Sequence, residues 1–139
     1  MTALADTGLL VALLYTRDQF HPWALTEFGR LRTPLLTCEA VLAETAHLVG
    51  TRGVPRDRVA RLVSSGAVRV AFDVQREALA VGRLLERYAD VPMDWADGCL
   101  VRMSELHADA EVFTLDRGSQ IYRRHRDQPI PTRMPVERR

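Results

Sequence analysis

The chain has 139 residues, of which 47% are hydrophobic and 27% charged, and this balance excludes a disordered protein and predicts one globular domain over 1–139. The longest apolar run, from Gly8 to Tyr15, is too short to cross a membrane and lacks the basic segment of a signal peptide. We therefore expect a cytoplasmic protein with no membrane partner. The formal net charge is only +1, but residues 117–139 contain seven arginines and two acids, so the end of the chain is basic.

The first half of the chain alternates short strands with helices. A strand is predicted over Thr2–Asp6, followed by a helix from Thr7 that is apolar on every side and should therefore be buried. A second helix is predicted over His21–Arg30 and a second strand over Pro34–Thr37. The next helix, Glu39–Gly50, is expected to end at its glycine.

The second half continues the same alternation. A helix over Pro55–Ser65, a strand over Val68–Phe72 and an amphipathic helix over Val74–Tyr88 are followed by a helix over Trp95–His107 and a strand over Glu111–Leu115. Strands that alternate with helices in this way predict an α/β fold with a mostly parallel sheet and helices on both faces.

The end of the chain has weaker patterns. We expect a turn at Arg117-Gly118 and a short helix up to Arg126. The remaining stretch is rich in proline and arginine, and residues from about 128 to 139 are predicted to form a poorly ordered basic tail.

Four acids occupy comparable places in this predicted arrangement. Asp6 follows the first strand, Glu44 lies one turn into the helix after the second, Asp97 is in a first helical turn, and Asp116 follows the last strand. Because the carboxyl ends of parallel strands meet at one crevice, we expect these acids to converge. Clustered carboxylates need a counter-charge, and their hard oxygen atoms favour Mg²⁺ or Mn²⁺. The chemistry that follows is metal-assisted cleavage of a phosphodiester.

Three neighbouring residues are assigned supporting roles, and each single acid also has a structural interpretation. Thr7 adjoins Asp6, Asp94 is placed as the cap of the helix that presents Asp97, and Thr114 should point to the same side as Asp116. Taken alone, Asp6 is more often a helix cap than a catalytic group. Glu44 alone is more often paired with a histidine or an arginine.

Other residue types that carry chemistry form no recognisable site. Cys38 and Cys99 lack the spacing of metal ligands and are predicted to be buried free thiols. None of the four histidines pairs with a plausible nucleophile, and the chain has no glycine-rich phosphate loop. A phosphatase based on Asp6-Thr7 is disfavoured because the second aspartate two residues later is missing.

The acidic segments also resemble a known family. The opening Ala5-Asp6-Thr7-Gly8, the segment from Thr37 to Glu44, the run Met93-Asp94-Trp95-Ala96-Asp97 and the block Thr114-Leu115-Asp116-Arg117 are similar, in that order, to PIN-domain ribonucleases, and specifically to the VapC-like toxins of type II toxin–antitoxin systems. The resemblance covers nearly the whole chain. One departure is Gly118-Ser119-Gln120, where many relatives have another acid and an aromatic residue.

This resemblance implies a three-layer α/β/α sandwich and an endoribonuclease that depends on Mg²⁺ or Mn²⁺. It implies RNA as the substrate, a cognate antitoxin as a partner, and a homodimer. By motif match, the metal-binding and catalytic positions fall to Asp6, Glu44, Asp97 and Asp116, with Asp6 and Asp97 as the expected direct ligands.

An acidic site needs help to approach a polyanion, and we assign this role to Arg117, Arg123 and Arg124. Two alternatives stay open: a PIN-type nuclease of RNA processing that is not a toxin, and a catalytically silent domain that binds RNA or a partner. Trp23, Phe28 and Leu31 are candidates for a partner surface, although a role in the core is the more common one for such residues.

Overall fold

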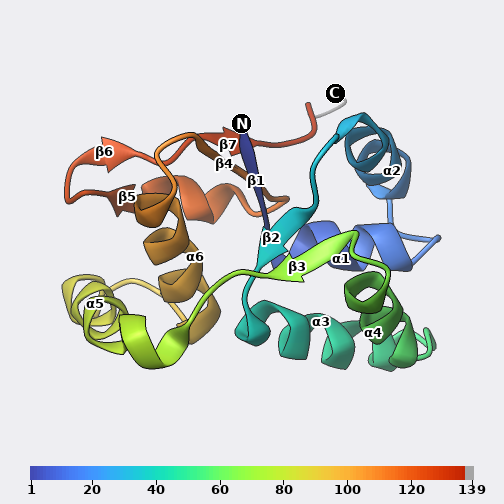
Figure 1. Ribbon diagram of the computed structural model, residues 1–139, viewed down its shortest axis with the longest axis horizontal. Helices are drawn as coiled ribbons and strands as arrows, with labels where there is room; N and C mark the ends of the chain where they lie inside the picture. Colours follow the sequence, from blue (N-terminus) through green and yellow to red (C-terminus); the bar gives the residue numbers. More distant parts are fainter. Residues whose placement is uncertain (137–139) are drawn as a thin grey trace.

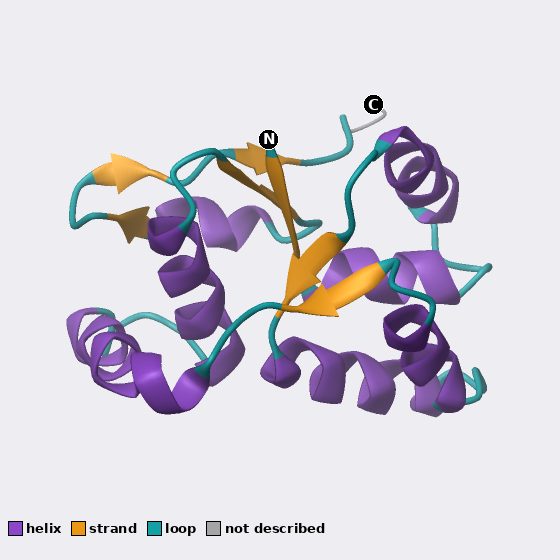
Figure 2. Ribbon diagram, in the orientation of Figure 1, coloured by secondary structure: helices purple, strands orange, loops and turns teal. Residues whose placement is uncertain are grey.

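The computed structural model describes residues 1–136 and has a five-stranded parallel sheet at its centre (Figures 1 and 2). The order of the strands across the sheet is β3-β2-β1-β4-β7, and every neighbouring pair is parallel. A separate antiparallel pair, β5 and β6, forms a hairpin. The strands are β1 (Thr2–Ala5), β2 (Leu35–Thr37), β3 (Val68–Val70), β4 (Ala110–Phe113), β5 (Arg123–Arg124), β6 (Gln128–Pro129) and β7 (Thr132–Arg133).

Helices flank the sheet, as the alternating pattern predicts. In Figure 1, α5 and α6 lie to the left of the central strands, and α1, α2 and α4 lie to the right. The helices are α1 (Thr7–Leu14), α2 (His21–Arg30), α3 (Glu39–Thr51), α4 (Asp57–Ser64), α5 (Val74–Arg87) and α6 (Trp95–Leu106). A 3₁₀ turn covers Arg117–Ile121.

The central strands and the helix that follows β1 form the core. Ala3, Leu4 and Ala5 of β1 are buried, and Leu9 and Leu10 of α1 are buried with them. The prediction that α1 is buried because it is apolar all round is therefore confirmed. This burial fixes the junction between β1 and α1, where Asp6 lies.

Predicted element boundaries differ from the observed ones by a few residues. The helix α3 continues past Gly50 to Thr51, and the chain turns instead at Gly53, which has a φ of 81° that favours glycine. The strand β4 ends at Phe113 and not at Leu115, so Thr114 lies just beyond it.

The prediction of a poorly ordered tail from about 128 is wrong for 128–133, where β6 and β7 form. The backbone N–H of Val112 donates to the carbonyl of Pro131 at 2.8 Å, and that of Thr114 donates to the carbonyl of Arg133 at 3.1 Å. Arg133 also pairs with Glu111 at 2.5 Å. The segment is thus an edge strand of the sheet, and the rest of the predicted tail, 137–139, lies outside the described residues.

Both cysteines are free and buried, as predicted. The fold also brings them together, which their spacing in the sequence does not indicate. The thiols of Cys38 and Cys99 share a hydrogen bond that lowers the pKa of Cys38 and raises that of Cys99. Trp23, Phe28 and Leu31 are partly buried and pack against the core. In the part of the chain that the structure describes, no helix is both long enough and apolar enough to cross a membrane.

Candidate active site

Asp6 lies at the carboxyl end of β1, beside the end of β4. Residues Ala5 and Phe113 are register partners in the two strands, so the residues that follow them are adjacent. The Oγ1 of Thr114 donates to Asp6 Oδ2 at 2.7 Å and accepts a hydrogen bond from the backbone N–H of Asp116 at 2.9 Å. One buried hydroxyl therefore links two of the predicted acids.

The other carboxylate oxygen of Asp6 is also held in place. Its Oδ1 accepts from the backbone N–H of Thr7 at 2.6 Å, which makes Asp6 the N-cap of α1. Asp6 can therefore cap α1 and also act as a ligand, because a carboxylate has room for further partners after accepting two hydrogen bonds.

Asp97 is presented by the first turn of α6, and Asp94 is the N-cap, as predicted. The side chain of Asp94 accepts from the backbone N–H of Asp97 at 2.8 Å, and the side chain of Asp97 accepts from the backbone N–H of Asp94 at 3.0 Å. This reciprocal pair is a capping box. It fixes the orientation of the Asp97 side chain.

Asp6 and Asp97 line the same small cavity, although they lie far apart in the sequence. The cavity has a volume of about 20 Å³, which is enough for a water molecule. Its walls are Asp6, Asp97, Leu100, Val101, Val112, Tyr122, Ile130 and Thr132. Ile130 and Thr132 belong to 128–139, for which the sequence predicts a poorly ordered tail, so this segment contributes to the site.

Tyr122 is a site residue that the sequence analysis missed. Its hydroxyl donates to the carbonyl of Pro92 at 3.0 Å and lies 3.5 Å from Asp97 Oδ2. Burial, followed by the charge of Asp97, raises the pKa of Tyr122 to about 12, so this hydroxyl stays protonated and can donate. A tyrosine after a turn carries no local signal of such a role.

Glu44 of α3 lies near enough to Asp6 and Asp94 for their charges to affect it. Burial raises its pKa, and repulsion from Asp94 and Asp6 adds to the rise. The hydroxyl of Thr7 is buried and has no hydrogen-bond partner of normal geometry among the described residues, but it approaches Glu44 closely enough to oppose that rise. An unsatisfied buried hydroxyl beside two carboxylates is a potential ligand atom.

The carboxylates influence one another through their charges. Burial is the main cause of the raised pKa of Asp6, and repulsion from Asp116 and Asp94 adds to it, while hydrogen bonds from Thr114 and Thr7 oppose it. Burial, with repulsion from Asp94 and Asp6, raises the pKa of Asp97 to about 7. Burial is the larger cause for both groups, and the smaller repulsive contributions reflect other carboxylates nearby.

Within the described residues, Asp6, Glu44, Asp94 and Asp97 form no ion pair with an arginine. Arginines there pair with other carboxylates. The donor chemistry therefore fits a hard divalent cation. In the same part of the chain, no three His, Cys, Asp or Glu side chains are grouped so that they could hold a metal ion. Mg²⁺ commonly uses only one or two carboxylates and keeps several waters, so Asp6 and Asp97 alone would suffice as protein ligands.

Comparisons with known proteins identify the fold. No protein-family model matches the chain, and no curated protein matches it by sequence. Among solved structures, it is similar to VapC20 of Mycobacterium tuberculosis, a toxin that cleaves the sarcin-ricin loop. The match has a TM-score of 0.76 at 20% sequence identity and covers 86% of this chain and 94% of the other. The chain has a PIN-domain fold.

In this PIN fold, the three arginines predicted to bind RNA do not all lie at the acidic cavity. Arg117 follows Asp116 directly and is exposed. Arg123 donates to the carbonyl of Gln120 at 2.7 Å. Arg124 donates to the carbonyl of Ser104 at 3.1 Å, near the carboxyl end of α6 and away from Asp97 at its start. The fold thus uses Arg124 to cap α6.

Proposed function

We propose that the protein is a metal-dependent endoribonuclease that hydrolyses phosphodiester bonds of RNA. The observation that carries this proposal is the meeting of Asp6 and Asp97 at one cavity, where neither carboxylate forms an ion pair with an arginine of residues 1–136. The fold it shares with an RNA-cleaving toxin supports the same reaction class. RNA is therefore the proposed substrate.

In this proposal, Asp6 and Asp97 hold Mg²⁺ or Mn²⁺, with Glu44, Asp116 and the hydroxyl of Thr7 as neighbouring acceptors. A bound divalent ion would lower the pKa of a water and offset the charge that develops on the phosphate. The chain's own contribution is to keep the acids aligned. Thr114 orients Asp6, and the capping box orients Asp97.

Tyr122 has a further role in this proposal. Its hydroxyl lies beside Asp97, and its ring forms part of the cavity wall. It packs edge-on against Tyr88, with the ring centroids 5.3 Å apart, and this packing fixes the position of the hydroxyl. The position of this hydroxyl beside Asp97 limits the room in which the Asp97 carboxylate can turn away from Asp6.

Cleavage is tested with the purified chain and a labelled RNA. We expect cleavage with Mg²⁺ or Mn²⁺, none with EDTA, and at least about a hundredfold loss in Asp6→Asn and Asp97→Asn. Asp73→Asn is the matched control, because Asp73 caps α5 and does not line the cavity. Cleavage that persists in EDTA, or in both site variants, contradicts the proposal.

We also propose that this nuclease is the toxin of a toxin–antitoxin pair, with an antitoxin as partner and a homodimer as its assembly. Expression should then stop growth, Asp97→Asn should not, and co-expression of a small neighbouring gene should relieve the arrest. Growth that continues despite measured cleavage would favour a nuclease of RNA processing. Absence of any cleavage would favour a silent binding domain.

A further inference from the structure

A second, larger depression lies beside the acidic cavity and is lined by arginines. It has a volume of about 620 Å³, in the range of ligand sites and far larger than an ion needs. We call it the arginine groove. Its walls come from α5, α6 and the turn of the β5–β6 hairpin, and they are Ala80, Arg83, Leu84, Arg87, Arg102, Glu105, His125 and Arg126.

The groove and the acidic cavity share one wall of packed side chains. Leu84, Val101 and Tyr122 form a small buried cluster. Leu84 faces the groove, whereas Val101 and Tyr122 face the cavity. The chain segment after Tyr122 leads directly into the hairpin whose turn lines the groove. The cavity and the groove therefore lie on the two sides of one packed cluster.

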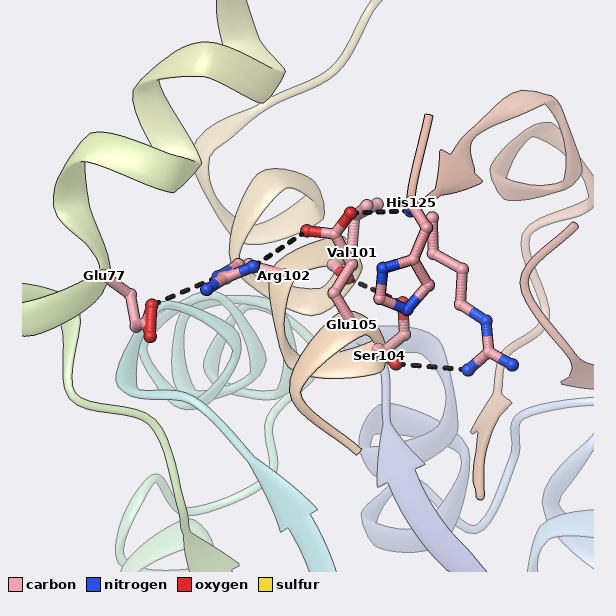
Figure 3. Close-up of polar contacts among 7 residues, drawn as sticks. Glu77, Val101, Arg102, Ser104, Glu105 and His125 are labelled. Atoms are coloured by element: carbon pink, nitrogen blue, oxygen red, sulfur yellow. Dashed lines mark hydrogen bonds and ion pairs between the residues drawn. The ribbon is translucent and has the colours of Figure 1, made fainter. Parts of the chain in front are cut away.

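Among the described residues, ion pairs neutralise one of the four arginines of the groove. Arg102 forms ion pairs with Glu77 at 3.1 Å and with Glu105 at 3.3 Å, as Figure 3 shows. Within residues 1–136, Arg83, Arg87 and Arg126 form no ion pair with a carboxylate. Arg83 and Arg87 are also one turn apart on α5, a spacing at which like charges repel.

The hairpin that completes the groove is held in an unfavourable backbone conformation. His125 and Arg126 have φ angles of 49° and 75°, in the left-handed region that favours glycine. Two contacts hold the turn: the backbone N–H of His125 donates to Glu105 at 2.7 Å, and the guanidinium of Arg87 donates to the carbonyl of Arg126. An arginine where glycine would fit better is explained if its side chain is needed at the surface.

We propose that the arginine groove binds the phosphates of RNA that flank the scissile bond. This inference rests on the proposed nuclease function and names a second contact area for its substrate. Arginines recognise phosphate through paired N–H groups, and three of them without a carboxylate partner suit a chain of phosphates. Because backbone contacts carry no base identity, the groove supplies affinity and not sequence choice.

The test separates binding from cleavage. Binding of a fluorescein-labelled single-stranded RNA of mixed sequence is measured by anisotropy in EDTA, at several salt concentrations. The variant combines Arg83→Gln with Arg126→Asn, because asparagine tolerates a left-handed φ. We expect affinity to fall about tenfold and the slope of log affinity against log salt to decrease by about 1.4, the value for two phosphates on a single strand.

Two further variants sharpen the test. Arg58→Gln with Arg69→Gln removes the same charge from α4 and β3, away from the groove. This control variant should keep the RNA affinity and the salt slope near the wild-type values. Glu105→Gln keeps an acceptor for His125 but removes the one acid of the groove, so affinity should rise.

Equal affinity and salt slope in the groove variant and the wild type would overturn the proposal, and a protein partner would then be the better explanation of the surface. Failure of RNA to bind at all would also overturn it. Neither result alters the test of the nuclease function, which is the metal-dependent cleavage by the wild-type chain and its loss in Asp6→Asn.

Discussion

At the scale of single residues, one buried hydroxyl organises the end of the sheet. Thr114 is fully buried, donates to Asp6 and accepts from the backbone of Asp116. A hydrogen bond to a charged group contributes about 1.5–3 kcal/mol, more than one between neutral groups. We therefore regard Thr114 as a positioning residue for Asp6.

Thr114→Val should lower RNA cleavage about tenfold, because Asp6 loses the donor that aligns it. The same hydrogen bond lowers the pKa of Asp6, so its loss should move the acidic limb of the pH–rate profile to higher pH. The control is Thr45→Val, which removes an equally buried hydroxyl that donates to the carbonyl of Val41 within α3. Equal pH profiles for the two variants would refute the role of Thr114.

Asp97 makes stability depend on pH in the metal-free protein. Its pKa is about 7 in the folded chain and near 3.8 when unfolded, so the folded state binds the proton more tightly. The free energy of unfolding should therefore decrease as the pH rises from about 4 to 7. In this interval the contribution of Asp97 is stabilising at low pH and is lost at high pH.

Asp97→Asn should remove this contribution. Relative to the wild type, its free energy of unfolding should rise by about 2 kcal/mol between pH 5 and 8, a value discounted for partial exposure. Urea denaturation in EDTA measures the difference, and the asparagine oxygen can still accept from the backbone of Asp94. A difference that stays constant over this pH range would show that Asp97 does not titrate there.

At the scale of elements, α6 depends on its capping box for both stability and placement. Asp94 and Asp73 each cap a helix by accepting from the backbone N–H three residues later, in α6 and α5 respectively. The two caps are chemically alike, but only α6 carries a proposed metal ligand in its first turn. They therefore form a matched pair.

Asp94→Ala and Asp73→Ala should each destabilise the protein by about 1 kcal/mol. Only Asp94→Ala should also reduce RNA cleavage, because the first turn of α6 then no longer fixes Asp97. Thermal unfolding and cleavage rates, measured side by side, distinguish the two effects. A similar loss of cleavage in both variants would mean that activity follows stability alone.

At the scale of the whole molecule, the last described residues complete the sheet. The strand β7 supplies the carbonyl that binds the backbone N–H of Thr114, and Ile130 lies on the core and in the cavity wall. Arg133 pairs with Glu111 of β4 and reaches Glu27 of α2 at 3.8 Å. Acidic residues of β4 and α2 thus partly neutralise the positive charge of the last part of the chain.

A chain that ends at Asp127 should lose cooperative folding or have a melting temperature lower by at least about 10 °C, because β4 becomes an unpaired edge and the cavity opens. The comparison is a chain that ends at Val136, which keeps every described residue. Circular dichroism during heating measures the cooperativity of unfolding and the melting temperature of the two chains. Equal melting curves would contradict an essential role for β7.

Local pattern was enough to predict much of this fold. The alternation of strands and helices, the burial of α1 and the capping role of Asp94 follow from periodicity and from side chains that bond their own backbone within a few residues. The strand β7 was missed because it has only two residues, with Pro131 directly before them. A strand this short has no periodicity, and proline is tolerated at an edge.

The sequence by itself determined which acids stand at or near the ends of elements, and it is the basis on which a hard cation is proposed for them. Only the tertiary structure decided which groups meet: Asp6 with Asp97 and Tyr122 at the cavity, and Cys38 with Cys99 in the core. It also directed Arg124 to the end of α6. The physical reason is that these contacts depend on strand order and helix packing across the whole chain, which short-range patterns do not encode.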